Sequence, residues 1–150
     1  MRTGRRLGID VGKARVGVAV SDPHGMLATP VATVQRADDS VRRVLEHAAE
    51  HEVIELVVGL PLSLSGGETP STADAREFAA QLAAGTDAPV RLVDERLSTV
   101  TAQSALHATG RNTKKSRSVI DQVAAVIILQ HALDTERSGG TPPGSIVAPE

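Results

Sequence analysis

The stretch that most constrains the fold is LGIDVGKARVGVAVSD, residues 7–22. Apolar residues alternate with small ones on both sides of residues 12–14, which is typical of two half-buried strands joined by a tight turn. Asp10 interrupts the first strand and shares its face with Gly8 and Gly12, because side chains alternate along a strand. Burying an unpaired carboxylate is costly, so this acid indicates a function. We expect the two glycines to leave room above it for a ligand.

The rest of the chain predicts one α/β domain. Extended segments are expected at 28–34, 56–60 and 90–94, and the second is apolar on both faces, as parallel strands covered by helices are. Helical periodicity follows residue 40 and recurs over the ranges 75–83, 98–107 and 119–134. This order predicts a five-stranded mixed sheet, an antiparallel three-strand meander plus two parallel strands, with helices on both faces. We expect the domain to span residues 1–134 and the Gly- and Pro-rich tail, residues 135–150, to be disordered.

The composition of the chain excludes several kinds of site and location. The 150 residues include no cysteine, which excludes disulfides and thiolate metal sites and fits a reducing, cytoplasmic setting. Arg5 and Arg6 are followed by charged residues where an export signal needs an apolar core, and the longest apolar run, 123–129, is too short to span a bilayer. We therefore expect no membrane partner.

Charge and aromatic content limit how nucleic acid could be bound. The net charge is −2 and Phe78 is the one aromatic residue, so neither a global attraction nor base stacking is available. A nucleic-acid partner would have to be held by a local basic patch or through metal ions.

Two further acids accompany Asp10. Glu95 follows the strand at 90–94, at the sheet edge where α/β folds build their sites, whereas Asp94 is expected to face the opposite side. A surface ion pair with Arg96 is the alternative for Glu95. Asp121 lies three residues after Ser118, which is the spacing of a capping box, so helix capping and ligand binding both stay open for it.

Three carboxylates without cysteine favour a hard divalent cation. We expect Mg²⁺ or Mn²⁺, as one or two ions, bound by Asp10, Glu95 and Asp121 as catalytic and metal-binding residues. Such sites hydrolyse phosphodiester bonds, the metal activating a water and stabilising the leaving oxygen. No covalent nucleophile is required.

Two short motifs resemble known catalytic or binding patterns, but neither is expected to be functional. Gly8 to Lys13 is one residue short of a phosphate-binding loop, and Ala14 follows where Ser or Thr belongs. His47 to His51 matches the H-x-x-E-H pattern of some zinc proteases, but it lies opposite the apolar stripe of its helix, which favours a solvated face.

Four positive charges are concentrated in residues 111–117, a polar segment that we expect to be a loop before the last helix. Phosphate groups are its expected partner, although a merely solvated loop is the alternative. The predicted nucleic-acid-binding residues are Lys13, Arg96, Arg111, Lys114, Lys115 and Arg117.

Four blocks of the chain, in order, resemble the YqgF/RuvX family: LGIDVGKARVGVAVSD, VVGLPLSLSG, VRLVDERLSTVTAQSAL and IDQVAAVIILQHALD, which together span residues 7–134. The resemblance implies an RNase H-like fold and a nuclease that processes the 5′ end of pre-16S ribosomal RNA in ribosome biogenesis. It also places the family's acids at Asp10, Glu95 and Asp121. RuvC resolvases take their second acid from the strand here at 56–60, which has none.

Three alternatives remain beside an rRNA nuclease. One is a Holliday junction resolvase acting on branched DNA, and another is a catalytically silent RNA-binding assembly factor. Actin- and Hsp70-like ATPases share the fold and an Asp-x-Gly hairpin, but they close two such domains around a nucleotide. The expected partner is structured RNA or branched DNA, bound by a monomer or homodimer.

Overall fold

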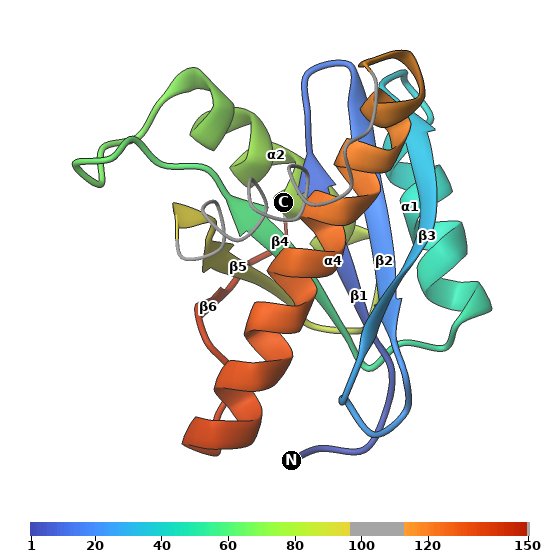
Figure 1. Ribbon diagram of the computed structural model, residues 1–150, viewed down its shortest axis with the longest axis vertical. Coiled ribbons are helices and arrows are strands. Elements are labelled where there is room, and N and C mark those ends of the chain that lie inside the picture. The colour runs from blue at the N-terminus through green and yellow to red at the C-terminus, as the bar shows by residue number, and fades with distance from the viewer. Residues whose placement is uncertain (97–112, 150) are drawn as a thin grey trace.

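A computed structural model describes the backbone of residues 1–96 and 113–149, and the side chains of these residues except 113–119. The elements in chain order are β1 (Arg6–Val11), β2 (Arg15–Ser21), β3 (Ala28–Gln35), α1 (Ser40–Glu50), β4 (Glu55–Leu60), α2 (Pro70–Ala84), β5 (Val90–Asp94), α4 (Thr113–Gly139) and β6 (Ser145–Ile146). Figure 1 shows them. The helix predicted over 98–107 lies outside the described residues.

The strands form one mixed sheet in the order β3-β2-β1-β4-β5-β6. β1, β2 and β3 are the predicted antiparallel meander, while β4 and β5 run parallel to β1. Pro30 lies in β3, an edge strand of the sheet, where its missing N–H is tolerated. The predicted mixed sheet is confirmed, with one strand more than expected, because the two-residue β6 pairs antiparallel with β5.

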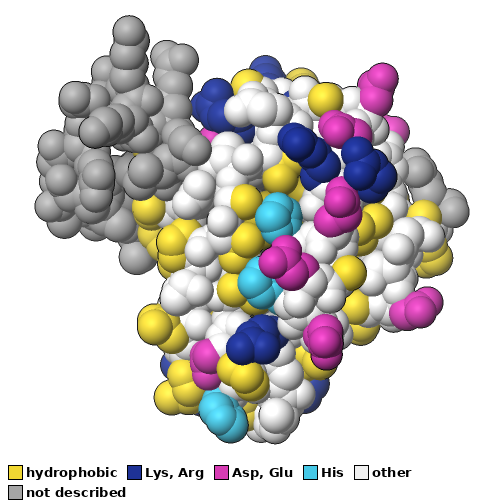
Figure 2. Space-filling view, turned by 90° about the vertical axis from the view of Figure 1, so that its right-hand side faces the viewer, with side chains coloured by type: hydrophobic (Ala, Val, Ile, Leu, Met, Phe, Trp, Pro, Cys, Tyr) yellow, Lys and Arg dark blue, Asp and Glu magenta, His cyan; other side chains and the backbone are white. Residues whose placement is uncertain are grey.

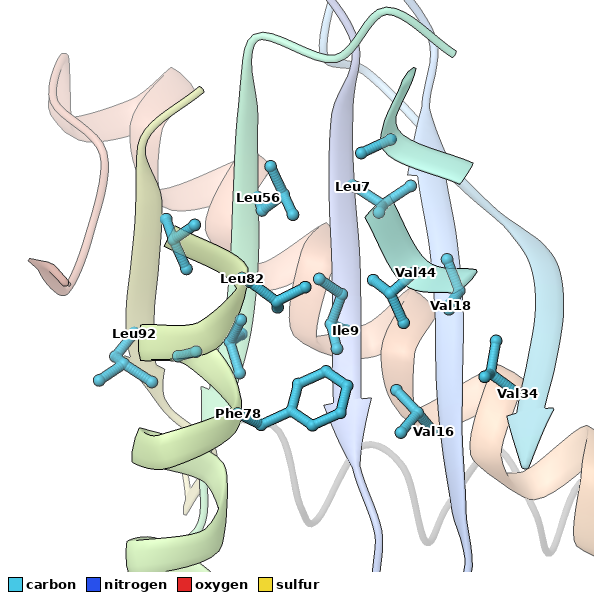
Figure 3. Packing of buried hydrophobic residues seen from close by; sticks show 14 of the residues in the cluster. Leu7, Ile9, Val16, Val18, Val34, Val44, Leu56, Phe78, Leu82 and Leu92 are labelled. Carbon is cyan, nitrogen blue, oxygen red and sulfur yellow. The ribbon is translucent and has the colours of Figure 1, made fainter. Parts of the chain in front are cut away.

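Helices cover both faces, as predicted. α1 and α2 pack on one face and α4 crosses the other (Figure 1). Between the sheet and the α1–α2 layer lies the larger core, in which Val44 of α1 and Phe78 and Leu82 of α2 meet the strands (Figure 3). The strand residues labelled there are Leu7, Ile9, Val16, Val18, Val34, Leu56 and Leu92.

Glycines on the other face let α4 approach the strands closely. A Cβ at Gly8 would lie 2.6 Å from Leu129 Cβ, and one at Gly12 would lie 2.6 Å from the carbonyl oxygen of Arg15 across the turn. The expectation that these two glycines leave room for a ligand is therefore wrong. Helix α4 and the hairpin turn fill the space instead.

Helix α4 is longer than the sequence predicts at both ends. It begins at Thr113 rather than Val119, because residues 111–138 contain no Gly or Pro and the segment before Val119 is rich in Lys and Arg, which are good helix formers. Most of the expected basic loop is thus helix. Asp121 lies beyond the first turn, so its interpretation as a capping-box residue of Ser118 is wrong.

The end of α4 belongs to the fold although the sequence predicts disorder from residue 135. Glu136 is only 4% exposed and accepts hydrogen bonds from Arg2 and Arg6, at 2.6 Å and 3.1 Å. Arg2 also donates to the buried Glu55. This charged cluster connects the N-terminus, β1, β4 and α4, so helix α4 and its contacts continue past residue 134.

The outer surface of α1 and β3 carries mixed charge. Acidic, basic and histidine side chains alternate over the face seen in Figure 2, so its described residues form no continuous basic surface.

Within the described ranges, none of the helices is long and apolar enough to cross a membrane.

Candidate active site

Asp10 and Glu95 meet at one edge of the sheet. β1 and β5 are both parallel neighbours of β4, so Asp10 near the end of β1 and Glu95 directly after β5 come to the same edge. The backbone N–H of Glu95 donates to Leu60 O at 3.0 Å, which extends the β4–β5 pairing by one step. The two carboxyl groups share a hydrogen bond. Gly59 of β4 passes beside them, and a Cβ there would lie 3.4 Å from Glu95 Oε2.

The environment of this pair favours protonation. Burial, followed by the negative charge of Glu95, their hydrogen bond and the charge of Asp121, raises the pKa of Asp10 to about 8. Burial also raises the pKa of Glu95, against the opposing effect of the hydrogen bond from Asp10. In the absence of a cation, the pair therefore holds a proton at neutral pH.

Asp121 approaches from α4 over the hairpin. A Cβ at Gly17 would lie 1.9 Å from the carbonyl oxygen of Asp121, so the helix can lie here only because residue 17 has no side chain. The carboxylate accepts a hydrogen bond from Arg15, with Nε 2.7 Å from Oδ2. The three predicted acids thus share one region, with Asp121 turned to a basic partner.

Arg15 was not predicted from the sequence as a residue of this site. Its position carries a signal nonetheless: Arg15 and Gly17 share a face of β2, and Gly17 is the register partner of Asp10. Strand alternation alone could therefore have placed Arg15 on the side of the acids.

The donor chemistry fits a divalent cation in part. Two carboxyl groups in direct contact offer the hard oxygen ligands that Mg²⁺ and Mn²⁺ prefer. As the side chains lie, however, the described residues contain no group of three or more His, Cys, Asp or Glu placed to hold a metal ion. Asp121 would have to turn from Arg15 to join Asp10 and Glu95.

Asp94 faces away from the acids, as strand alternation predicts. Its neighbour Val93 packs against α4, whereas Asp94 pairs with Arg96, Nη2 lying 2.6 Å from Oδ2. The guanidinium of Arg96 lowers the pKa of Asp94. Arg96, a predicted nucleic-acid contact, is exposed and already bound to this carboxylate.

The other predicted basic contacts are only partly placed. Lys13 is exposed in the β1–β2 turn, where its charge, after the larger effect of Arg36, lowers the pKa of Asp74. Arg111 lies outside the described residues. Helix α4 carries Lys114, Lys115 and Arg117 in its first turns, with side chains outside the described set.

The H-x-x-E-H motif lies at the end of α1, away from the acids. His47 and His51 are both partly exposed, and Nδ1 of His47 is 4.0 Å from Glu50 Oε2. This agrees with the predicted solvated face.

Comparison with known proteins identifies the family. The sequence model of the RuvX family, described as "Holliday junction resolvase", matches residues 4–135. A protein of Clavibacter sepedonicus is 64% identical over 150 residues, covering 98% of this chain and 93% of the relative. One from Streptomyces coelicolor is 59% identical over 147 residues, covering 96% and 88%. Both carry the name "Putative pre-16S rRNA nuclease".

Solved structures confirm the predicted RNase H-like fold. RuvC of Thermus thermophilus, in complex with Holliday junction substrate, superposes with a TM-score of 0.60 at 18% identity, covering 93% of this chain and 99% of RuvC. At that identity the likeness concerns the fold alone. The match of the family model over most of the chain, together with the high identity of its relatives, shows that the chain belongs to the RuvX family.

Proposed function

We propose that this protein is a divalent-metal-dependent nuclease that processes the 5′ end of pre-16S rRNA. The observation that carries the proposal is the hydrogen-bonded carboxyl pair of Asp10 and Glu95 at the sheet edge, with Asp121 beside it. Family membership and the names of the curated relatives support the phosphodiester-hydrolysing activity and the rRNA substrate.

The chain's own residues have defined tasks in this reaction. Asp10 and Glu95 would hold the cation through carboxylate oxygens, and Asp10 would release its proton to become a ligand. The chemistry that a cation would supply there is activation of a water and stabilisation of the leaving oxygen. Asp121 would add a third carboxylate if it left Arg15, and strands β1 and β5 hold the first two acids in place.

The proposed nucleic-acid contacts are phosphate contacts. Arg111, Lys114, Lys115 and Arg117 are close in sequence to Asp121 and would grip the backbone without reading its sequence. Lys13 and Arg96 flank the site at the β1–β2 turn and after β5. For the setting, we propose the cytoplasm and a monomer or homodimer.

Cleavage of branched DNA is the second candidate. It is favoured by the description of the RuvX family model. A silent RNA-binding factor is the third, and the pairing of Asp121 with Arg15 rather than with the other acids is the observation on its side.

A side-by-side cleavage assay separates these functions. A pre-16S rRNA 5′-leader fragment and a four-way DNA junction are incubated with the protein in Mg²⁺, Mn²⁺ or EDTA. We expect metal-dependent cleavage of the RNA. Cleavage of the junction alone would establish the resolvase, and binding without cleavage of either substrate in any metal would establish the silent factor.

A further inference from the structure

We propose that Arg15 is a substrate-binding residue of this site, its guanidinium held by Asp121 until it binds the phosphate whose ester bond is broken. The inference rests on the proposed nuclease function and deepens it. It assigns a role to a residue that neither the acidic triad nor the basic segment before Asp121 includes.

The position of Arg15 supports this role. Arg15 is the first residue of β2, directly after the turn that joins β1 to β2. It lies on the face of β2 that α4 covers, two residues before Gly17. Its side chain is 28% exposed and that of Asp121 is 15% exposed, so the ion pair is partly open to solvent rather than enclosed in the core. Solvent, and therefore a substrate, can reach the guanidinium.

The hydrogen bonding of Arg15 leaves most of its donors available. Within the described part of the chain, Nε donates to Asp121 Oδ2, and the two η-nitrogens make no hydrogen bond. A guanidinium presents its donors as a planar fork that matches two oxygens of a phosphate. Among the described residues, therefore, none occupies the η-nitrogens, and both can bind a phosphate beside the acids.

Two other described arginines of this region are engaged elsewhere, while Lys13 is exposed in the β1–β2 turn. Arg36 donates to Asp74, and Arg96 donates to Asp94 on the opposite face of the strand. Arg15 is instead paired with one of the three acids themselves. A guanidinium at this point attracts a phosphate and offsets the repulsion between its charge and those of the acids.

The ion pair also has a consequence for the metal. While Arg15 holds Asp121, that acid forms no metal-binding group with the other described acids, and the positive guanidinium opposes a cation nearby. A phosphate that draws Arg15 away frees Asp121 for the metal. Substrate and metal are then bound cooperatively, and Arg15 links them.

The test is a double-substitution cycle between Arg15 and one phosphate. The linkage cut by the wild-type protein is first mapped and then replaced by a neutral methylphosphonate. Affinity is measured for the unmodified substrate and for the methylphosphonate substrate. The proteins compared are Asp10→Asn, which is expected to bind without cutting, and Asp10→Asn combined with Arg15→Gln. Arg42→Ala serves as the matched control, since Arg42 is an exposed arginine on α1 paired with Glu46.

We expect Arg15→Gln and the methylphosphonate each to weaken binding about tenfold, and the two together to weaken it no further. The slope of log K against log salt should fall by about 0.7 to 0.9. Additive losses would overturn the inference, because Arg15 would then act through the structure and not through that phosphate. A normal affinity for the unmodified substrate in Arg15→Gln protein would overturn it as well.

Metal binding without nucleic acid gives a second readout. In a Mn²⁺ titration, Arg15→Gln protein should bind the ion more tightly than wild type, because a competing cation has been removed from Asp121. Weaker binding would mean that Arg15 orients Asp121 for the metal, which contradicts the proposal. If the proposed nuclease function is wrong, the wild-type protein will cut neither the pre-16S rRNA fragment nor the four-way junction, and this result does not depend on Arg15.

Discussion

Gly17 and Asp121 are packed backbone against backbone: a Cβ at residue 17 would come within 1.9 Å of the carbonyl oxygen of Asp121. Strand β2 and helix α4 therefore approach each other at the point where the helix delivers an acid to the site. The position of Asp121 depends on the absence of a side chain at residue 17.

Gly17→Ala should consequently displace α4 and destabilise the protein by about 1–3 kcal/mol, the usual range for overpacking. Urea unfolding measures the loss. Gly139→Ala is the matched control, because nothing lies within 4 Å of a Cβ at the end of α4, and it should leave stability unchanged or slightly raised. Equal stability of the two variants would contradict the close packing.

The pKa of Asp10 predicts how metal-free stability depends on pH. Because the folded-state value, about 8, lies above the ordinary value of 3.8, the buried neutral carboxyl stabilises the fold fully below pH 3.8. That stabilisation is lost as pH rises toward about 8, by up to about 1.4 kcal/mol per pH unit. In EDTA, the melting temperature of the wild type should thus fall relative to that of Asp10→Asn across this window. Parallel pH profiles for the two proteins would be inconsistent with a buried, protonated Asp10.

Shortening the chain tests where the domain ends. A chain stopped after Gly139 keeps Glu136 and its contacts with Arg2 and Arg6, whereas one stopped after Asp134 leaves the buried Arg6 without this carboxylate. Breaking a buried ion pair in this way costs about 3–5 kcal/mol. Thermal melting should separate the two chains clearly, and similar melting temperatures would place the boundary at 134 after all.

The basic segment before Asp121 is tested by Lys114→Ala with Lys115→Ala. If both lysines contact phosphates, binding to RNA and DNA of any sequence should weaken, and the slope of log K against log salt should fall by up to about 1.4 to 1.8. The melting temperature should hardly change, since alanine is at least as good a helix former as lysine. An unchanged slope would assign these lysines to a solvated helix surface.

Strand periodicity predicted the sheet well, because alternation within residues 7–22 and the apolar run at 56–60 are local signals. It also predicted that Glu95, and not Asp94, faces Asp10. The extent of α4 was missed because the polar residues from Thr113 onward have helical propensity but no apolar stripe to reveal it. Arg15 and Glu136 were missed for a different reason, since their partners, Asp121 and Arg2, are far away in sequence.

Asp10 and Glu95 are proposed as the carboxyl pair that holds the catalytic cation, and the most direct test compares Glu95→Gln with Asp94→Asn. Both substitutions remove one charge from adjacent residues at nearly constant shape. Metal-dependent cleavage of the pre-16S rRNA fragment and the four-way junction is measured for both, with Asp10→Asn and Asp121→Asn alongside and circular dichroism melting to establish folding. We predict that Glu95→Gln, Asp10→Asn and Asp121→Asn abolish cleavage while binding is largely kept, and that Asp94→Asn cuts nearly as well as the wild type. An active Glu95→Gln protein beside an inactive Asp94→Asn protein would contradict the account.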